Sequence, residues 1–244
     1  MPVSLSNDRI NLTMLTDFYE ITMANGFFET GNRDRIAYFD MFYRNIPDHG
    51  GLVIMAGVEQ VVYYLNNLKF TEGDIEFLRG KGFGEEFLDY LRNFKFEGDI
   101  WAVPEGTVIF PNEPVITVRA KAPQAQFIET YILMQFNHQS CIATKASRMV
   151  RAAEGRAISE FGSRRAQGAD AAMLGARAAY IGGVAGTACT ISDEYYHVPS
   201  TGTMAHAWVQ MFPDEYTAFK TYCQMYPNNP TLLVDTYNTL KSGV

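Results

Sequence analysis

The chain has 244 residues, of which 47% are hydrophobic and 19% charged, so it can bury the core of one large domain or two smaller ones. Seventeen Phe and fourteen Tyr residues argue against disorder. The formal net charge is −7 and no run of Lys and Arg occurs, which argues against a nucleic-acid partner. A small anionic substrate stays compatible with this balance, because a local arginine cluster can oppose the global charge.

Cysteine usage and hydropathy narrow the class of protein further. Cys141, Cys189 and Cys223 are widely spaced and form no Cys-x-x-Cys pair, so we expect no zinc site and infer a reducing, cytoplasmic environment. Residues 1–12 lack the basic and then apolar pattern of a secretory signal. The longest apolar stretch, 171–184, is interrupted by Arg177, so we expect no membrane span.

Residues 1–122 are expected to form an N-terminal α+β domain. Asp17 and Glu20 resemble a helix cap, which predicts a helix that continues to about Phe28. Thr71 and Asp74 predict the start of another helix. The spacing of the apolar residues predicts helices at 54–68, 71–80 and 85–94. It predicts strands at 35–43, 99–103, 107–110 and 115–120.

Residues 123–244 are expected to form a second domain. Pro123 opens a long helical pattern that reaches about Glu154. Beyond it, short strands alternate with helices, and such alternation predicts a parallel sheet and an α/β fold. The strands are expected at 157–161, 184–188, 200–205 and 231–235, and the helices at 169–181, 192–196 and 214–225.

The segment EFGSRRAQG at residues 160–168 carries the first candidate site. Arg164 and Arg165 follow a predicted strand end and precede a helix, where guanidinium groups and free backbone N–H groups could bind an anion. Gly162 and Gly168 would let the backbone approach a ligand closely. The alternative is that both arginines are ordinary surface residues.

The segment GTMAH at residues 202–206 carries the second candidate. His206 follows Gly202 and Thr203 at a predicted strand end, and a histidine can accept a proton or a phosphoryl group. Asp235 ends another predicted strand, where a carboxylate could hold ribose hydroxyls or magnesium. The alternatives are a structural histidine and a helix-capping aspartate.

Five segments in this order resemble the nicotinate phosphoribosyltransferase family over essentially the whole chain. They are TDFYEITMA at 16–24, NHQS at 137–140, EFGSRRAQG at 160–168, GTMAH at 202–206 and LVDTY at 233–237. The resemblance implies an N-terminal α/β domain followed by the first half of an irregular α/β barrel, with domains at 1–122 and 123–244. Family chains run well beyond residue 244, so the likeness is to their N-terminal half.

The resemblance also implies a reaction. Nicotinate and phosphoribosyl pyrophosphate would give nicotinate mononucleotide and pyrophosphate, with Mg²⁺ and with ATP as co-substrate. His206 would be the phosphorylated histidine, and Arg164 would bind the nicotinate carboxylate. Tyr19 would stack on the pyridine ring across a homodimer interface, and Phe161 would line its other face. Gly202 and Thr203 would line the substrate site, and Asp235 would lie near ribose or magnesium.

Three alternative functions can be compared with the sequence. The chain could be an inert fragment or a subunit that needs a partner chain. It could be a nicotinamide phosphoribosyltransferase, although the adjacent Arg164 and Arg165 favour an acid as substrate. A phosphosugar aldolase or isomerase barrel would need a Schiff-base lysine or a Glu/His pair at strand ends, and the sequence offers neither.

Overall fold

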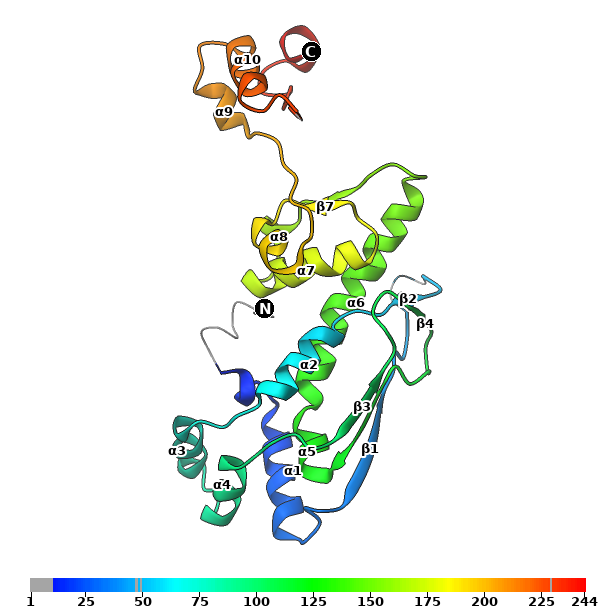
Figure 1. The fold of residues 1–244 in the computed structure, drawn as a ribbon, viewed down its shortest axis with the longest axis vertical. Helices are drawn as coiled ribbons and strands as arrows, with labels where there is room; N and C mark the ends of the chain where they lie inside the picture. The colour runs from blue at the N-terminus through cyan, green and yellow to red at the C-terminus, as the bar shows by residue number, and fades with distance from the viewer. Residues whose placement is uncertain (1–10, 47, 49, 229) are drawn as a thin grey trace. The chain divides into compact units, whose positions relative to one another are not determined.

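The computed structural model describes residues 11–46, 48, 50–228 and 230–244, and these residues fold as two compact units (Figure 1). One unit reaches Pro199, and the other spans Ser200–Val244. The boundary expected between residues 122 and 123 stays a prediction. None of the described helices is both long and apolar enough to cross a membrane.

An antiparallel sheet of three strands is the centre of the first unit. Its order is β1 (Ile36–Met41), β5 (Ile116–Lys121) and β3 (Asp99–Ala102), with Met41 and Ala102 both opposite Ile116. One face carries Met41, Ile116 and Val118, which are buried. The other face carries Tyr38 and Trp101, which are exposed. This alternation confirms the strands predicted from the period-two pattern.

A second pair of strands corrects one helix prediction. β2 (Val53–Ile54) pairs antiparallel with β4 (Val108–Ile109), so Ile54 is in a strand. The predicted helix at 54–68 is shorter and is α2 (Val58–Asn67). Gly57 precedes it with φ +107°, and a Cβ at that position would be 2.8 Å from the carbonyl oxygen of Gln135. The chain can turn here against α6 because this residue has no side chain.

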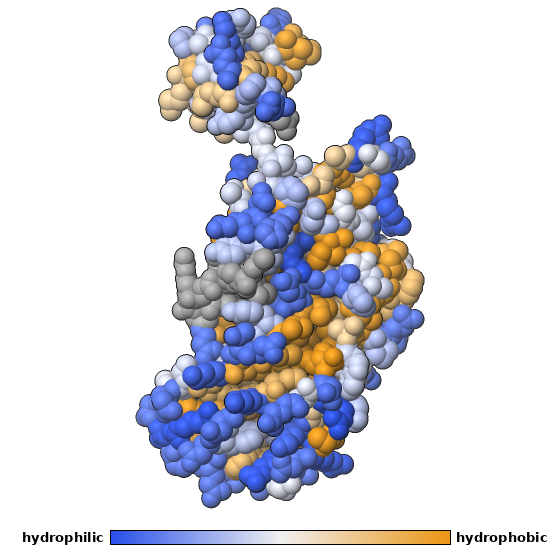
Figure 2. All heavy atoms as spheres, in the orientation of Figure 1, coloured by the Kyte–Doolittle hydropathy of each residue, from blue (hydrophilic) through white to orange (hydrophobic). Residues whose placement is uncertain are grey.

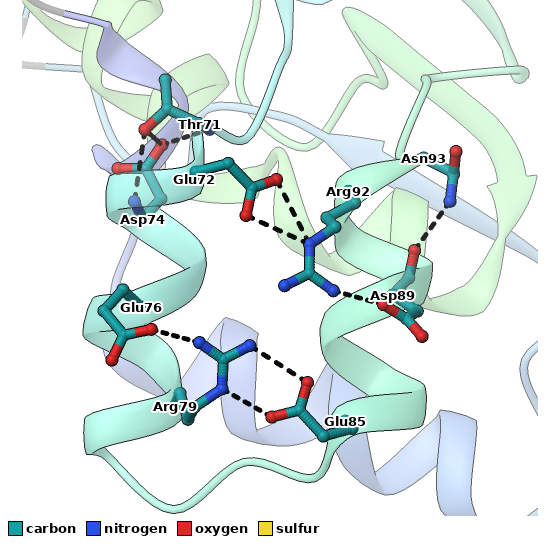
Figure 3. Close-up of polar contacts among 9 residues, drawn as sticks. All are labelled: Thr71, Glu72, Asp74, Glu76, Arg79, Glu85, Asp89, Arg92 and Asn93. Carbon is teal, nitrogen blue, oxygen red and sulfur yellow. Dashed lines mark hydrogen bonds and ion pairs between the residues drawn. The ribbon is translucent and has the colours of Figure 1, made fainter.

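Helices α3 (Glu72–Gly80) and α4 (Glu85–Arg92) confirm two predicted helices, and they form an antiparallel hairpin. Thr71 and Asp74 form the expected capping box. Ion pairs cross between the helices: Arg79 Nε lies 2.5 Å from Glu85, and Arg92 Nε lies 3.2 Å from Glu72 (Figure 3). The outward surface of the hairpin is mostly hydrophilic (Figure 2). Its inner face packs Ile75, Leu78, Phe87, Leu88 and Leu91 into the main core.

Helix α1 (Phe18–Glu29) confirms the predicted N-terminal helix but corrects its cap. Asp17 occupies the capping position, yet its side chain makes no capping hydrogen bond. Glu20 is fully buried and binds elsewhere: its Oε1 accepts hydrogen bonds from the backbone N–H and hydroxyl of Thr130, at 3.0 and 2.9 Å. The tertiary contact therefore replaces the local cap.

The predicted helix at 123–154 is divided into α5 (Ala122–Phe127) and α6 (Glu129–Ala152). The interruption is at Ile128, whose backbone N–H bonds to the carbonyl of Gln126. The N–H of Thr130 is directed to Glu20 rather than to the preceding turn. A carboxylate 110 residues away in the sequence thus supports the break.

Two short parallel strands follow, β6 (Ser159–Glu160) and β7 (Gly186–Thr187). They are joined through α7 (Ala169–Ile181), and α8 (Thr190–Tyr196) follows β7. Helix α7 ends at Gly182 as predicted, and a Cβ there would lie 2.4 Å from the carbonyl oxygen of Ala143. Close packing of α7 on α6 therefore requires glycine at this position. The structure confirms the α/β alternation in this part.

The second unit contains α9 (His206–Gln210), α10 (Glu215–Met225) and a terminal helical turn, Thr239–Gly243. Its small core includes Met204, Val209 and Ala218. The strands predicted at 200–205 and 231–235 are wrong, because among the described residues neither segment forms a strand beyond a single bridge at Ser200. The hydroxyl of Thr203 instead donates to the carbonyl of Thr231 at 2.6 Å. An extended segment becomes a strand only where a neighbouring backbone pairs with it.

Candidate active site

A cavity of about 800 Å³ opens where β6 ends, between α6 and α7. Its volume lies within the roughly 300–1,000 Å³ typical of small-ligand sites. The lining combines apolar side chains with a few polar ones from distant parts of the sequence. The polar or charged members among the described residues are Gln135, His138, Glu160, Ser163, Arg165, Gln167 and Asp170.

The loop after β6 is held by Glu160. Its Oε2 accepts a hydrogen bond from the Thr187 hydroxyl at 2.6 Å, and its Oε1 accepts one from the backbone N–H of Gly162. The following residues form a 3-10 turn, Ser163–Arg165. Gly168, with φ +109°, then leads into α7. Glu160 therefore fixes the turn that carries the arginine pair.

The two arginines of this turn are placed differently. Both are exposed, but Arg165 lines the cavity and Arg164 is not among the lining residues. Phe161 is 47% exposed and is also absent from the lining. The hydroxyl of Ser163 is buried without a hydrogen-bond partner among the described residues. A buried polar atom of this kind normally has a partner, so a ligand with a polar group would satisfy it.

His138 reaches the cavity from α6. Its Nε2 lies 3.3 Å from the carbonyl oxygen of Ala171 on α7. The contact fixes the orientation of the imidazole ring at the cavity wall. His138 falls within the helical pattern predicted from Pro123 to about Glu154, and the structure places it in α6.

Tyr19 lies on the first turn of α1 and does not line this cavity. Its ring is 45% exposed, and its hydroxyl donates to Glu129 Oε1 at 3.2 Å. Partial burial and the neighbouring Glu129 carboxylate raise the pKa of Tyr19 to about 12. The phenol is therefore neutral at physiological pH and can act as a hydrogen-bond donor.

The second unit brings the remaining candidates together. His206 is the first residue of α9, and its Nε2 lies 3.9 Å from Asp235 Oδ1. Its Nδ1 lies 3.3 Å from the hydroxyl of Thr236. Thr203 approaches the same chain segment through its bond to Thr231, and Gly202 precedes it. The imidazole is about half exposed, so a phosphoryl donor could reach it.

A buried network around Arg177 was missed as a structural feature. The Arg177 guanidinium binds Glu105 through two hydrogen bonds, at 2.6 and 3.1 Å, and Glu59 at 2.5 Å. Glu105 also accepts the backbone N–H groups of Gly57 and Val58 at the start of α2. The available signal was a single arginine in an apolar helix, because buried charges are normally paired.

The described residues offer little to a metal ion. No group of three or more His, Cys, Asp or Glu side chains lies close enough in the described ranges to hold one. Asp235 contributes a single carboxylate that faces His206. Mg²⁺ prefers several oxygen ligands in octahedral geometry. These residues therefore do not form a magnesium site by themselves.

The fold and cavity define an α/β protein with a candidate small-molecule site at the carboxyl end of a parallel strand. Residues 14–137 match the family model described as the nicotinate phosphoribosyltransferase (NAPRTase) N-terminal domain. The chain is 44% identical over 229 residues to nicotinate phosphoribosyltransferase pncB2 of Mycobacterium tuberculosis, covering 93% of this chain and 49% of that protein. It is 42% identical over 235 residues to nicotinate phosphoribosyltransferase of Bacillus subtilis, covering 96% and 48% respectively.

A solved structure agrees with these matches. The crystal structure of human nicotinic acid phosphoribosyltransferase superposes with a TM-score of 0.86 at 27% identity, covering 94% of this chain and 56% of that one. The chain therefore belongs to the nicotinate phosphoribosyltransferase family. It spans about half the length of the curated relatives it matches.

Proposed function

We propose that the chain forms the N-terminal part of a nicotinate phosphoribosyltransferase that serves NAD biosynthesis. The ring nitrogen of nicotinate would attack C1 of phosphoribosyl pyrophosphate, and pyrophosphate would leave through an oxocarbenium-like transition state. Positioning and electrostatic stabilisation would supply most of the rate. The observation that carries the proposal is the cavity at the end of β6, which combines Arg165 with the unpaired hydroxyl of Ser163.

The carboxylate of nicotinate is the group this cavity would recognise. A guanidinium binds a carboxylate through two parallel hydrogen bonds, which gives both affinity and orientation. Arg165 lines the cavity, so the geometry favours it for this role. Arg164 stays the prediction of the sequence resemblance, and Phe161 stays the predicted aromatic on one face of the pyridine. Tyr19 would reach the other face from the partner in a homodimer.

ATP would act through His206. Its imidazole is accessible, and Asp235 lies close enough to orient it. Phosphorylation would add negative charge to the site and reset its affinity for phosphoribosyl pyrophosphate. Gly202 and Thr203 leave room for the phosphoryl group. Mg²⁺ would arrive with the phosphate groups of the substrates, since this chain supplies no magnesium site of its own in its described residues.

The cytoplasm is the compartment we propose. All three cysteines fall within the described residues and carry free thiols, which supports a reducing environment. The alternative hypothesis is that the chain is a subunit that is inert without a partner chain. It is retained because the chain covers only about half the length of the relative.

Genetic complementation tests the proposed function. The gene would be expressed as a chimera in which this chain replaces the corresponding part of the Bacillus subtilis relative, in a strain that can make NAD only from nicotinate. We expect growth on nicotinate, and we expect Arg165→Ala to raise the nicotinate concentration that growth requires by about ten- to a hundred-fold. A folded chimera that supports no growth would refute the proposal. Growth on nicotinamide alone, in a strain without a deamidase, would favour the nicotinamide alternative.

A further inference from the structure

Glu20 is a buried carboxyl group that the proposed reaction leaves without a role. Its side chain is fully enclosed, although it lies on the first turn of α1 beside two exposed aromatic residues, Phe18 and Tyr19. An enclosed carboxylate must be hydrogen-bonded to be tolerated. Glu20 meets this requirement entirely through side chains and backbone groups outside its own helical turn.

The contacts of Glu20 connect α1 to the junction between α5 and α6. Thr130 donates its backbone N–H and its hydroxyl to Oε1, at 3.0 and 2.9 Å. The Thr16 hydroxyl contacts Oε2 and lies 3.2 Å from the carbonyl oxygen of Phe127. The hydroxyl of Thr130 also accepts the backbone N–H of Asp17 at 3.2 Å. Thr16 and Asp17, which precede α1, and Glu20 in its first turn are therefore tied to the same point.

Tyr19 is held by the same junction. Its hydroxyl donates to Glu129 Oε1, and the other Glu129 oxygen accepts a hydrogen bond from Gln126 Nε2 at 2.7 Å. Glu129 and Thr130 are consecutive, so the partners of Tyr19 and of Glu20 move together. Figure 1 shows α1 running along α5, next to the start of α6.

We propose that Glu20 is a positioning residue that fixes the orientation of the Tyr19 ring through Thr130. Without the carboxylate, the start of α1 keeps only the exposed contacts of Asp17 and Tyr19 with α6, and the bond between Tyr19 and Glu129 no longer has a rigid base. For the role of Tyr19 as the pyridine-stacking residue, the inference rests on the proposed function. For the geometry of Tyr19, it rests only on the contacts described.

The test reads the Tyr19 ring directly in the full chain. Carbon-13 labelling of tyrosine rings gives its NMR signal, which is assigned with Tyr19→Phe. We expect Glu20→Ala and Thr130→Val to move this signal toward that of a free tyrosine. Glu20→Gln should keep it near the parental position, since an amide can accept from Thr130 and donate to the Thr16 hydroxyl.

Two controls separate positioning from general stability. Glu29→Gln changes an exposed carboxylate at the other end of α1, and Ile75→Val removes one methyl group from the core under α3. Neither substitution should move the Tyr19 signal, even if it changes the free energy of unfolding. An unmoved signal in folded Glu20→Ala, or in Thr130→Val if the alanine variant does not fold, would overturn the proposal.

Nicotinate titration of the same variants connects the geometry to the reaction. We expect about a tenfold weaker apparent affinity in Glu20→Ala and less than a twofold change in Glu20→Gln. Failure of the parental chain to bind nicotinate would count against the proposed function, while the ring signal would still decide the role of Glu20. Equal affinity in parent and Glu20→Ala, with a displaced ring signal, would overturn the link to substrate.

Discussion

The imidazole Nε2 of His206 lies 3.9 Å from Oδ1 of Asp235, across 29 residues of sequence. Nδ1 of the same ring lies 3.3 Å from the hydroxyl of Thr236, the next residue. One ring nitrogen therefore lies within hydrogen-bonding distance of Thr236, and the other faces the carboxylate of Asp235. Both side chains of the His206–Asp235 pair are more than half exposed, so the pair contributes little to stability and remains accessible.

His206 should therefore carry the phosphoryl group from ATP. We expect His206→Asn to abolish acid-labile label from γ-labelled ATP and to remove ATP stimulation, while slow ATP-independent synthesis persists. Asp235→Ala should reduce labelling, because the ring is less well oriented. The measurement is incubation of the complemented enzyme with labelled ATP, followed by acid treatment. Undiminished acid-labile label in His206→Asn would disprove the assignment and make His138 the next candidate.

The arginine pair offers a matched comparison. Arg165→Ala should weaken the binding of nicotinate by about ten- to a hundred-fold, since a hydrogen bond to a charged group contributes roughly 1.5–3 kcal/mol. Arg164→Ala should change it less than threefold, because Arg164 does not line the cavity. Competition with nicotinamide measures the effect, and only the acid should lose affinity in Arg165→Ala. A larger loss of nicotinate affinity in Arg164→Ala than in Arg165→Ala would show that Arg164 binds the carboxylate.

Stability should depend on pH through Glu20. Burial raises the pKa of Glu20 from 4.5 to about 7, against the opposing hydrogen bonds of Thr130, and the carboxylates of Glu129 and Asp17 add smaller increases. The folded state then holds the proton more tightly than the unfolded state. This contribution to stability is fully present below about pH 4.5 and is lost as the pH rises through 7.

Glu20→Gln should remove that dependence. Relative to the parent, we expect its free energy of unfolding to rise by about 2–3 kcal/mol between pH 4 and pH 8. Urea unfolding across this range measures the difference, with Glu29→Gln as the exposed control. A difference between Glu20→Gln and parent that stays constant with pH would contradict the expected titration.

The buried and exposed arginines should differ in their effect on stability. Arg177→Met leaves the largely buried Glu105 without its cation and should cost about 3–5 kcal/mol, whereas the half-exposed Glu59 adds little to this loss. Arg79→Met removes ion pairs to Glu76 and Glu85 on the surface of the helical hairpin (Figure 3) and should cost less than about 1 kcal/mol. Urea unfolding compares them, and similar small losses would show that the Arg177 network is not stabilising.

The features that sequence predicted well depend on local chemistry. The start of α3 follows from Thr71 and Asp74 three residues apart, and the end of α7 follows from Gly182. The outer and inner faces of β5 follow from simple alternation. In each case the residues that decide the structure lie within one turn or one strand of each other.

The features that sequence missed depend on distant partners. The break at Ile128 is supported by Glu20, and the segments 200–205 and 231–235 fail to become strands because the described residues give them no continuous ladder, only a single bridge at Ser200. The choice between Arg164 and Arg165 depends on the rotation of a 3-10 turn, which the neighbouring Glu160 fixes. Sequence could place an arginine pair after β6, but it could not say which member faces the cavity.

Conversion of labelled nicotinate is the most direct test of the account. The purified chain, together with the remaining segment of the Bacillus subtilis relative, would be incubated with phosphoribosyl pyrophosphate, ATP and Mg²⁺. We predict formation of nicotinate mononucleotide that requires phosphoribosyl pyrophosphate, is stimulated by ATP and needs about ten- to a hundred-fold more nicotinate in Arg165→Ala. A folded, associated pair that binds neither nicotinate nor phosphoribosyl pyrophosphate and forms no product would contradict it.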